Sequence, residues 1–252
     1  QQPGREQLVS GNRDVGTEPS TSLVAVVGDV QGHVAALRDG LAAIGVDVEA
    51  RRLPAELAVV QVGDLVHKGP ASEETVDFVD EMLDENPGRW VQLLGNHEAQ
   101  YLGGPEFWDA VVTDRSVQVL KRWLDSGQAR LAVALSTDEG EVLVSHAGIT
   151  FQLWRALGSP DATATATALN RLVLEDPSAA FRPGSMLRGS TGQAGVVWAE
   201  AGSELYRSWA AAETASVDAP FGQIHGHTSV MRWSRHEWGA TTPAVVGKPA
   251  EA

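Results

Sequence analysis

Short runs of hydrophobic residues alternate along the first part of the chain with stretches in which apolar residues recur every three or four positions. The runs predict strands over residues 23–27, 57–62 and 90–94. The first of these runs is uninterrupted and predicts a strand buried on both faces. The amphipathic stretches that begin at Val34 and Ser72 predict helices. This alternation predicts an α/β (α+β) fold, in which a βαβ sheet is covered by helices on both faces.

The pattern continues, less regularly, through the second half of the chain. Helices are predicted over residues 107–112 and 116–124, and a helix start or surface segment over 162–168. Further strands are predicted over residues 131–135, 142–144 and 221–224. Residues 1–21 are polar and rich in Gly, Pro, Ser and Thr, which predicts a flexible N-terminal arm before a single domain over residues 22–252.

A polar cluster follows each of five predicted strands. The clusters are Gly28-Asp29-Val30-Gln31-Gly32, Gly63-Asp64-Leu65, Gly95-Asn96-His97-Glu98, Ser145-His146-Ala147-Gly148 and Gly226-His227-Thr228. Open α/β sheets bind their ligands at the ends of strands, so these side chains are predicted to converge. Oxygen donors mixed with imidazoles suit Mn²⁺, Fe or Zn²⁺ better than Ca²⁺ or Mg²⁺. Asp64 is the candidate to bridge two such cations ~3.5–4 Å apart.

Composition narrows the classes of function. A chain of 252 residues with 43% hydrophobic residues is large enough for one substantial core. Its net charge of -14 argues against binding a nucleic-acid polymer, whose phosphates need Lys and Arg partners. The absence of cysteine excludes disulfides and a thiolate nucleophile. No apolar run reaches the ~18 residues that a membrane span needs, so we expect a cytoplasmic protein, with a processed secreted form as the alternative.

In their order along the chain, the motifs Gly-Asp-Val-x-Gly, Gly-Asp-Leu-Val-x-x-Gly-Pro, Gly-Asn-His-Glu, His-Ala-Gly and Gly-His-Thr resemble those of the calcineurin-like metallophosphoesterases. Within that family the chain is most similar to the phosphoprotein phosphatase branch, in particular to bacterial Shewanella-like phosphatases and to symmetrical diadenosine tetraphosphatases. The resemblance implies a β-sandwich flanked by helices. It also implies two divalent metal ions, with Mn²⁺ as the first choice and Fe or Zn²⁺ as alternatives.

The resemblance also implies the roles of individual residues. The first metal would be held by Asp29, Gln31 and Asp64, and the second by Asp64, Asn96, His146 and His227. A hydroxide between the metals would attack phosphorus, and His97 would protonate the leaving group as general acid. Lys68, Arg188, Asn96 and His97 would bind the phosphate.

This chain departs from the family at three positions that bear on the chemistry. Gln31 stands where a histidine is usual, and its neutral amide oxygen should weaken or re-select the first metal. His67-Lys68 stands where Asp-Arg is common, so His97 lacks its usual carboxylate. Either Glu98 or Asp29 replaces that carboxylate, or leaving-group protonation is weaker. Lys68 supplies a point charge with less geometric control than arginine.

Other residues have simpler interpretations. His225 is expected to be a structural histidine and His33 a residue at a helix N-terminus. Trp123, Trp154 and Trp209 fall in apolar helical patterns and are expected to pack in the core.

Three functions remain open at this point. The first is hydrolysis of phosphate monoesters, on Ser/Thr- or Tyr-phosphoproteins or on small molecules. The second is symmetrical hydrolysis of dinucleoside polyphosphates such as diadenosine tetraphosphate. The third is a degenerate member that binds metal or phosphate without turnover. The sequence leaves the physiological substrate and the oligomeric state undetermined.

Overall fold

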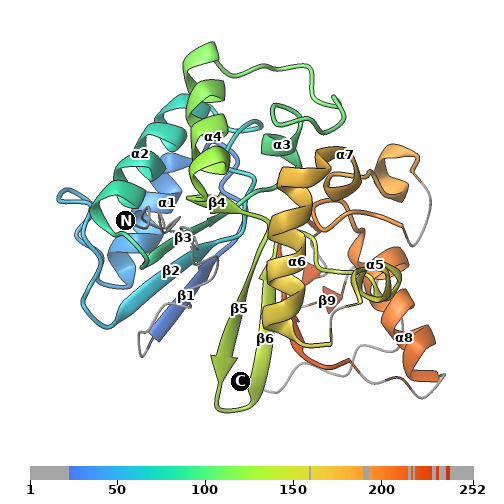
Figure 1. Ribbon diagram of the computed structural model, residues 1–252. Coiled ribbons are helices and arrows are strands. Elements are labelled where there is room, and N and C mark those ends of the chain that lie inside the picture. The colour runs from blue at the N-terminus through green and yellow to red at the C-terminus, as the bar shows by residue number, and fades with distance from the viewer. Residues whose placement is uncertain are drawn as a thin grey trace, which may run out of the picture.

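The computed structural model describes residues 23–158, 160–189, 193–214, 217, 219–228, 231–232 and 237–238. The predicted arm over residues 1–21 lies outside this described part of the chain. The fold is a mixed α/β arrangement in which two sheets lie between helical layers (Figure 1).

The first sheet consists of four parallel strands. Their order is β1 (Leu23–Val27), β2 (Leu57–Gln61), β3 (Trp90–Leu93) and β4 (Ala129–Arg130). All five residues of β2 are buried, whereas Leu23 on β1 is 57% exposed. The prediction that the first strand is buried on both faces was therefore wrong, because β1 lies at the edge of the sheet and has a neighbour on one side only.

Helices that follow these strands cover the outer face of the sheet. They are α1 (Val34–Ala43), α2 (Ser72–Glu85) and α4 (Asp114–Ser126). Each buries an apolar stripe, as the spacing predicted: Leu37 and Leu41 on α1, and Val76, Val79 and Leu83 on α2. Trp123 on α4 is fully buried, and its indole Nε1 donates a hydrogen bond to Asp80 at 2.8 Å.

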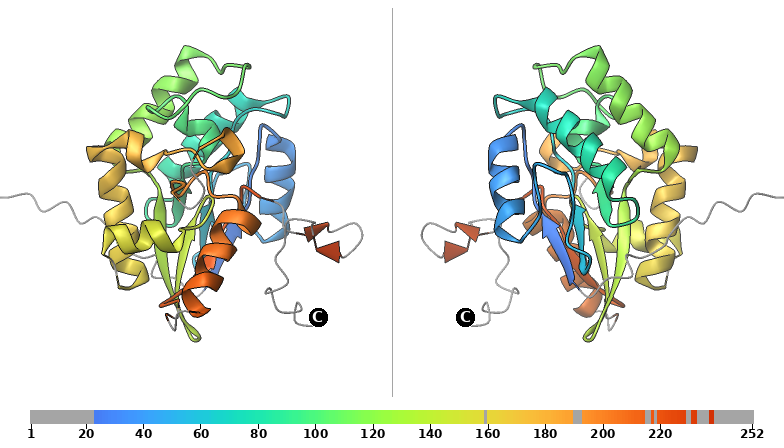
Figure 2. Two further views of the ribbon diagram at one scale, coloured as in Figure 1. Left: turned by 90° about the vertical axis from the view of Figure 1, so that its right-hand side faces the viewer. Right: turned by 90° about the vertical axis from the view of Figure 1, so that its left-hand side faces the viewer.

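The second sheet begins with the hairpin of β5 (Ala132–Thr137) and β6 (Gly140–Ser145), to which β7 (Gly222–Ile224) pairs in parallel with β6. Helix α6 (Ala162–Glu175) packs on β5 and β6. The two side views show α1 and α2 on one flank of the molecule and α5, α6 and α8 on the other (Figure 2).

The remaining elements are short. They are α3 (Asn96–Ala99), α5 (Phe151–Leu157), α7 (Pro177–Ala180), the 3₁₀ helix η1 (Ser185–Leu187), the π-helix η2 (Ala201–Tyr206), α8 (Arg207–Thr214), β8 (Met231–Arg232) and β9 (Glu237–Trp238). Trp154 on α5 and Trp209 on α8 lie half-buried against each other, with ring centroids 5.5 Å apart, so their predicted packing role is confirmed.

A small hydrophobic core joins the two sheets. Valine and leucine side chains of β2 and β3 meet those of β5 and β6, namely Val60, Val91 and Leu93 from the first sheet and Val133, Leu135 and Val144 from the second. The predicted β-sandwich flanked by helices is therefore confirmed.

One predicted helix was wrong. Residues 107–112 form no helix and run as an irregular segment. The preceding Gly103-Gly104-Pro105 interrupts helical geometry, and the rings of Phe107 and Trp108 pack against two histidines. The apolar residues that suggested a helix instead cover the polar clusters.

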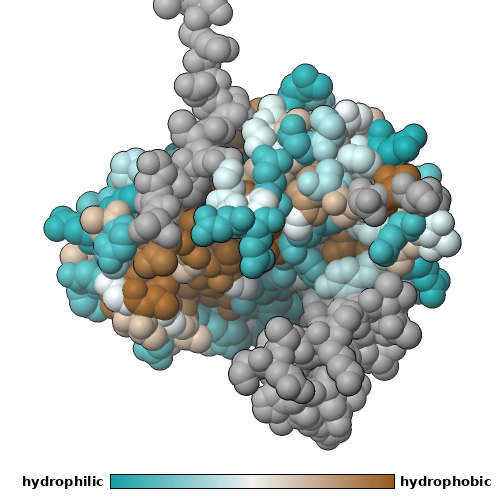
Figure 3. All heavy atoms as spheres, turned by 90° about the horizontal axis from the view of Figure 1, so that it is seen from below, coloured by the Kyte–Doolittle hydropathy of each residue, from teal (hydrophilic) through white to brown (hydrophobic). Residues whose placement is uncertain are grey.

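Seen from below, the molecule exposes a patch of hydrophobic surface on one side (Figure 3). Large exposed apolar residues near the outer ends of the sheets include Leu23 and Val24 on β1 and Ile224 on β7. Among the described residues, no helix combines the length and the apolar character needed to cross a bilayer.

Candidate metal centre

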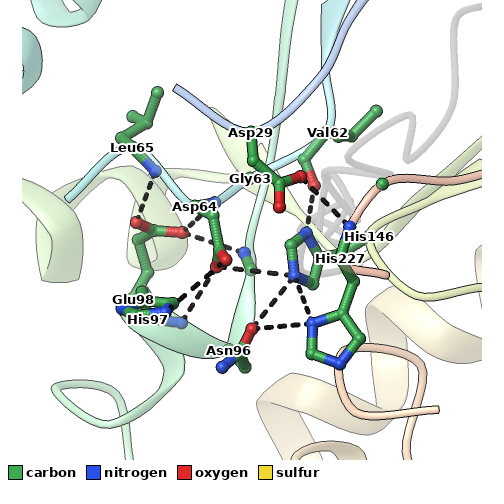
Figure 4. A network of polar contacts seen from close by, with 12 residues as sticks. Asp29, Val62, Gly63, Asp64, Leu65, Asn96, His97, Glu98, His146 and His227 are labelled. Carbon is green, nitrogen blue, oxygen red and sulfur yellow. Dashed lines mark hydrogen bonds and ion pairs between the residues drawn. The ribbon is translucent and has the colours of Figure 1, made fainter. Parts of the chain in front are cut away.

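Five strand ends deliver the predicted ligands to one place. Asp29 follows β1, Asp64 follows β2, Asn96 and His97 follow β3, His146 follows β6 and His227 follows β7. In the close view, Asp64 lies at the centre, with His97 and Glu98 on one side and His146 and His227 on the other (Figure 4). The motifs therefore converge as their order and spacing predicted.

Two motif glycines allow the loops to approach the carboxylates closely. A Cβ atom on Gly95 would overlap a carboxylate oxygen of Asp64, and one on Gly226 would overlap a carboxylate oxygen of Asp29. The backbone of the third and fifth clusters therefore lies directly against the two aspartates. Glycine is required at these positions by contact, and not only by turn geometry.

The backbone around the site is held in an unusual conformation. Five residues that are not glycine adopt left-handed φ angles: Gln31 (51°), Asp64 (55°), His67 (71°), Lys68 (58°) and His227 (62°). Each such residue costs on the order of 1–3 kcal/mol and persists only when its surroundings impose it.

Main-chain hydrogen bonds impose this conformation by joining the first two loops. The amides of Val30 and Gln31 donate to the carbonyl of Asp64 at 3.0 and 2.7 Å, and the amide of Gly69 donates to the carbonyl of Gln31 at 2.7 Å. The loops that carry the first two aspartate motifs are thus fixed relative to each other.

Asn96, His146 and His227 form a cluster of lone-pair donors. The Nδ1–H of His146 donates to the carbonyl of Val62 at 3.0 Å, so its Nε2 carries a lone pair. That Nε2 lies 3.1 Å from Asn96 Oδ1 and 3.1 Å from His227 Nδ1, and Asn96 Oδ1 lies 3.0 Å from His227 Nδ1. The oxygen is also an acceptor, so at most one hydrogen, on Nδ1 of His227, serves these three contacts.

Asp64 completes this cluster. Its Oδ1 lies 3.4 Å from His146 Nε2, and the side chain is only 2% exposed. Burial, with the nearby charge of Asp29 as the second cause, raises the pKa of Asp64 to about 8. Burial, together with His146, lowers the pKa of His227 to about 2. The site therefore disfavours both a negative carboxylate and positive imidazoles while it holds no cation.

A divalent cation fits this arrangement. Ligand atoms of Asp64, His146 and His227 lie within 4.8 Å of one another. A cation among them would offset the mutual repulsion of the lone pairs and the cost of ionising Asp64. The mixed oxygen and nitrogen donors match the chemistry of Mn²⁺, Fe or Zn²⁺. Asn96 Oδ1 is positioned as a fourth ligand.

The predicted first metal position is arranged differently. The side-chain amide of Gln31 forms a hydrogen bond with Asp64 that lowers the pKa of this carboxyl group. Asp29 Oδ1 accepts a hydrogen bond from the backbone amide of His227 at 3.1 Å. Asp29 is therefore near the cluster, but both it and Gln31 already have hydrogen-bond partners.

His97 lies on the opposite side of Asp64 from the cluster. Its backbone amide donates to Asp64 Oδ1 at 3.0 Å, and its Nε2 lies 3.8 Å from Asp64 Oδ2. Its other ring nitrogen, Nδ1, lies 2.6 Å from Nδ1 of His67. The residue that departs from the family pattern is therefore the partner of the expected general acid.

His67 is itself enclosed. It is 3% exposed, its Nε2 lies 2.7 Å from the hydroxyl of Tyr101, and the ring of Trp108 stacks on it at 5.9 Å. Phe107 packs edge-on against His97 at 4.9 Å.

Sequence reasoning missed Tyr101, Phe107 and Trp108 as parts of the site. The only sequence signal was the position of Tyr101, four residues after His97 and hence one helical turn away.

Glu98 does not take the place of the missing carboxylate. Its Oε2 accepts hydrogen bonds from the amides of Asp64 at 2.8 Å and Gly95 at 2.9 Å, and its Oε1 accepts from Leu65 at 2.8 Å. Burial, followed by the charge of Asp64, raises the pKa of Glu98 to about 7. Glu98 therefore shapes the loop that presents Asp64, and Asp29 is held by His227, so His97 has His67 as its partner.

The two candidate phosphate-binding cations differ in position. Lys68 is exposed, and its charge lowers the pKa of His67, of His97 and of Asp64, which places it beside the site. Arg188 is also exposed, at the end of η1 with φ 57°. The residues 190–192 that follow it lie outside the described part of the chain.

Two histidines have the structural roles that were expected. His33 is the N-cap of α1 and is exposed. His225 Nε2 lies 2.9 Å from the hydroxyl of Tyr206, so it is a satisfied histidine next to the ligand cluster. Trp198, in the Val-Val-Trp segment, packs edge-on against Phe107 at 4.8 Å and lies 6.2 Å from His227.

Comparison with known families agrees with this site. The profile of the calcineurin-like phosphoesterases matches residues 22–231, which is most of the chain. The chain therefore belongs to the calcineurin-like phosphoesterase family. It is accordingly a metal-dependent phosphoric ester hydrolase. No curated protein sequence matches it.

Solved structures share the fold. A point mutant of a cold-active protein tyrosine phosphatase is 19% identical with a TM-score of 0.57, and the match covers 84% of this chain and 69% of that one. The cold-active protein-tyrosine phosphatase of a psychrophilic Shewanella species is 19% identical with a TM-score of 0.52, covering 73% of this chain and 59% of that one. At this identity the likeness establishes the fold alone.

Proposed function

We propose that the protein hydrolyses phosphate monoesters, with aryl phosphates such as phosphotyrosine preferred over alkyl phosphates. One observation carries the proposal: Asp64, Asn96, His146 and His227 present electron-rich atoms to a common point, with His97 across Asp64 from them. This arrangement suits a cation that grips a phosphoryl group beside a proton donor.

The ligands divide between two cation positions. Asp64, Asn96, His146 and His227 would hold one cation, and Asp29, Gln31 and Asp64 the other, with Mn²⁺ as the preferred metal. When bound, such cations activate water and polarise the phosphoryl oxygens. The chain itself supplies the charge of Lys68 for the phosphate and Nε2 of His97, beside Asp64, for the leaving group.

The surroundings of His97 support an aromatic leaving group. Phe107 and Trp108 pack against the His97 ring at centroid distances of 4.9 and 5.1 Å. Both residues also line a pocket of about 460 Å³ together with Tyr101. Aromatic rings stack favourably on one another, by roughly 0.5–1.5 kcal/mol beyond burial. A phosphotyrosine ring beside His97 would gain these contacts, whereas a serine side chain would not. The likeness to tyrosine phosphatases is in keeping with this preference.

The proposal can be tested by turnover of matched substrates. Protein loaded with Mn²⁺ should hydrolyse p-nitrophenyl phosphate, and it should release phosphate faster from a phosphotyrosine peptide than from the same peptide with phosphoserine. Asp64→Asn should lower both activities by at least ~10²–10³-fold, while Asp125→Asn, at an exposed position on α4, should leave them unchanged.

Two results would contradict the proposal. Faster cleavage of diadenosine tetraphosphate than of any monoester would identify a dinucleoside polyphosphate hydrolase. Tight Mn²⁺ binding without hydrolysis of any of these substrates would identify a member that binds metal without turnover.

A further inference from the structure

A chain of contacts leads away from His97 to the backbone of an irregular loop. The amide of Val112 donates to the hydroxyl oxygen of Tyr101 at 3.2 Å. The same hydroxyl lies 2.7 Å from Nε2 of His67, and Nδ1 of His67 lies 2.6 Å from Nδ1 of His97. Each close contact between nitrogen or oxygen atoms requires one hydrogen, so the hydrogens along this chain must point in a consistent direction.

The outer end of these contacts sets the direction, and the inner end is compatible with it. At the outer end, the Val112 amide already donates to the phenol oxygen, so the phenol hydrogen is free to be donated to Nε2 of His67. At the inner end, Asp64 Oδ2 lies 3.8 Å from Nε2 of His97, which is too far for a hydrogen bond and leaves room for a hydrogen on that nitrogen. His67 then carries its hydrogen on Nδ1 and donates it to Nδ1 of His97.

We propose that Tyr101, acting through His67, keeps the proton of neutral His97 on Nε2, the nitrogen that faces Asp64. Tyr101 and His67 are therefore positioning residues, and the chain of three side chains replaces the carboxylate–histidine pair that is common in the family. The kinetic consequence of this arrangement rests on the proposed phosphatase activity, but the tautomer itself does not.

The direction of the hydrogen bonds from Tyr101 through His67 to His97 decides whether His97 can donate a hydrogen bond to the leaving group. With the hydrogen on Nε2, His97 presents an N–H on the side of Asp64, where substrate would bind. With the opposite direction, His97 would present a lone pair there and would repel a leaving oxygen. A wrong histidine tautomer is costly for catalysis even when the geometry is preserved.

The side chains packed around His67 and His97 are suited to keeping these hydrogen bonds in one direction. His67 is 3% exposed, with the ring of Trp108 stacked on it at an interplanar angle of 13°, and its amide donates to Ser72 at 2.8 Å. His97 is likewise 3% exposed. Water therefore has little access to the two imidazoles, and Tyr101 is the group that selects the direction.

Position 67 offers an internal comparison. The Oδ1 atom of an aspartate is separated from Cβ by the same number of bonds as the Nδ1 atom of a histidine. His67→Asp would therefore place a carboxylate oxygen where Nδ1 now contacts His97. That oxygen only accepts, so the variant should move the His97 proton to Nδ1 and make His97 independent of Tyr101.

The tautomer can be read directly. Long-range ¹H–¹⁵N spectra of the full chain labelled at histidine, metal-free and loaded with diamagnetic Zn²⁺, should show His97 protonated at Nε2. Tyr101→Phe should populate the Nδ1 form, and His67→Asp should convert His97 to it. An Nδ1 proton on His97 in the unaltered protein, or an unchanged tautomer in Tyr101→Phe, would overturn the proposal.

Kinetics should separate positioning from a structural loss. Tyr101→Phe should lower kcat about tenfold on phenyl phosphate and much less on p-nitrophenyl phosphate, whose leaving group is already stable as an anion, because a hydrogen bond from the Nε2–H of neutral His97 stabilises the negative charge that develops on the leaving oxygen. KM should be unchanged on both. Equal losses on the two substrates would contradict the proposal.

The second tyrosine provides the matched control. The hydroxyl of Tyr206 lies 2.9 Å from Nε2 of His225, so Tyr206→Phe removes a similar contact that does not lead to His97. It should alter neither the His97 tautomer nor the ratio of the two substrates. In a His67→Asp background, adding Tyr101→Phe should leave that ratio unchanged. If no substrate is hydrolysed, the proposed function fails, while the spectra still decide the tautomer.

Discussion

The two sides of Asp64 satisfy their polar groups in opposite ways. On one side, Asn96, His146 and His227 bring three polar atoms to within 3.1 Å of each other, with at most one donor hydrogen, on Nδ1 of His227, for the three contacts. On the other side, Gln31 is hydrogen-bonded to Asp64, and His97 is hydrogen-bonded to His67. A cation therefore relieves more repulsion on the first side than on the second.

This difference bears on how the two metal positions should fill. A cation on the side of His146 removes repulsion and desolvation costs that already exist. A cation on the side of Gln31 must displace a hydrogen bond and gains only a neutral amide oxygen in return. We therefore expect one tight and one weak metal position, and each prediction below tests that asymmetry.

The largest effect should come from the residue common to both sides. Asp64→Asn removes the shared carboxylate, so activity should fall by at least ~10²–10³-fold, the loss that one electrostatic contact to the transition state can account for. The metal-free variant should also melt at a higher temperature near neutral pH, because asparagine is neutral without having to bind a proton in the buried site. Calorimetry and turnover measure the two effects. A metal-free variant that melts lower would show that the cluster is not strained without a cation.

Gln31→His should strengthen the weak position. The new imidazole supplies a stronger donor beside Asp29, so the second Mn²⁺ should bind about tenfold more tightly, or by about 1.4 kcal/mol. Titration calorimetry should show only the weaker of the two binding events changing. Gln118→His, at an exposed position on α4, is the control and should change neither. If Gln31→His tightened both Mn²⁺ binding events equally, the proposed difference between the two metal positions would be contradicted.

Stability should depend on pH in opposite ways on either side of about pH 6.5. Burial lowers the pKa of His97 from 6.5 to about 3 and that of His227 to about 2. As pH falls below 6.5, these histidines therefore take up protons in the unfolded chain but not in the folded protein, and stability is lost. Burial raises the pKa of Asp64 from 3.8 to about 8, so the folded protein retains a proton that the unfolded chain releases.

The carboxyl group therefore makes stability fall as pH rises toward 8, while the histidines no longer contribute above about pH 7. Thermal melting of the metal-free protein should show a maximum near pH 6.5–7. Each kcal/mol lost should lower Tm by roughly 2–4 °C. Saturating Mn²⁺ should abolish the decline between pH 7 and 8, because the cation replaces the proton on Asp64. A decline that persists with Mn²⁺ would show that the metal does not contact Asp64.

The positions of the ligands could be predicted from sequence because they depend on the main chain. Each ligand follows a strand end, and parallel strands end at one edge. Asp64 and Asn96 therefore converge in the first sheet, and His146 and His227 converge after the parallel strands β6 and β7 of the second. The hydrophobic runs and turn residues that define strands are local signals. The order of the motifs then identified the family.

The surroundings of His97 could not be predicted in the same way. His67 and His97 are separated by 30 residues, and their contact depends on the left-handed turn at His67 and on the rings that cover it. Residues 107–112 were expected to form a helix because Phe107, Trp108 and Val112 fit an apolar pattern. The apolar pattern correctly predicted that these side chains are packed, but it did not predict their secondary structure. Phe107 and Trp108 pack over the two histidines from an irregular segment, and not against the core from a helix.

The smallest effect should distinguish the two candidate phosphate ligands. The charge of Lys68 acts on Asp64 and His97, so Lys68→Ala should raise KM about tenfold, or by about 1.4 kcal/mol, close to the lower end of what a hydrogen bond to a charged group contributes. Lys121→Ala, at an exposed position on α4, should leave KM unchanged. Arg188→Ala measures the second candidate on the same scale. If Arg188→Ala raises KM more than Lys68→Ala does, the phosphate is held mainly by Arg188 at the end of η1, and the charge of Lys68 serves mainly to keep His97 neutral.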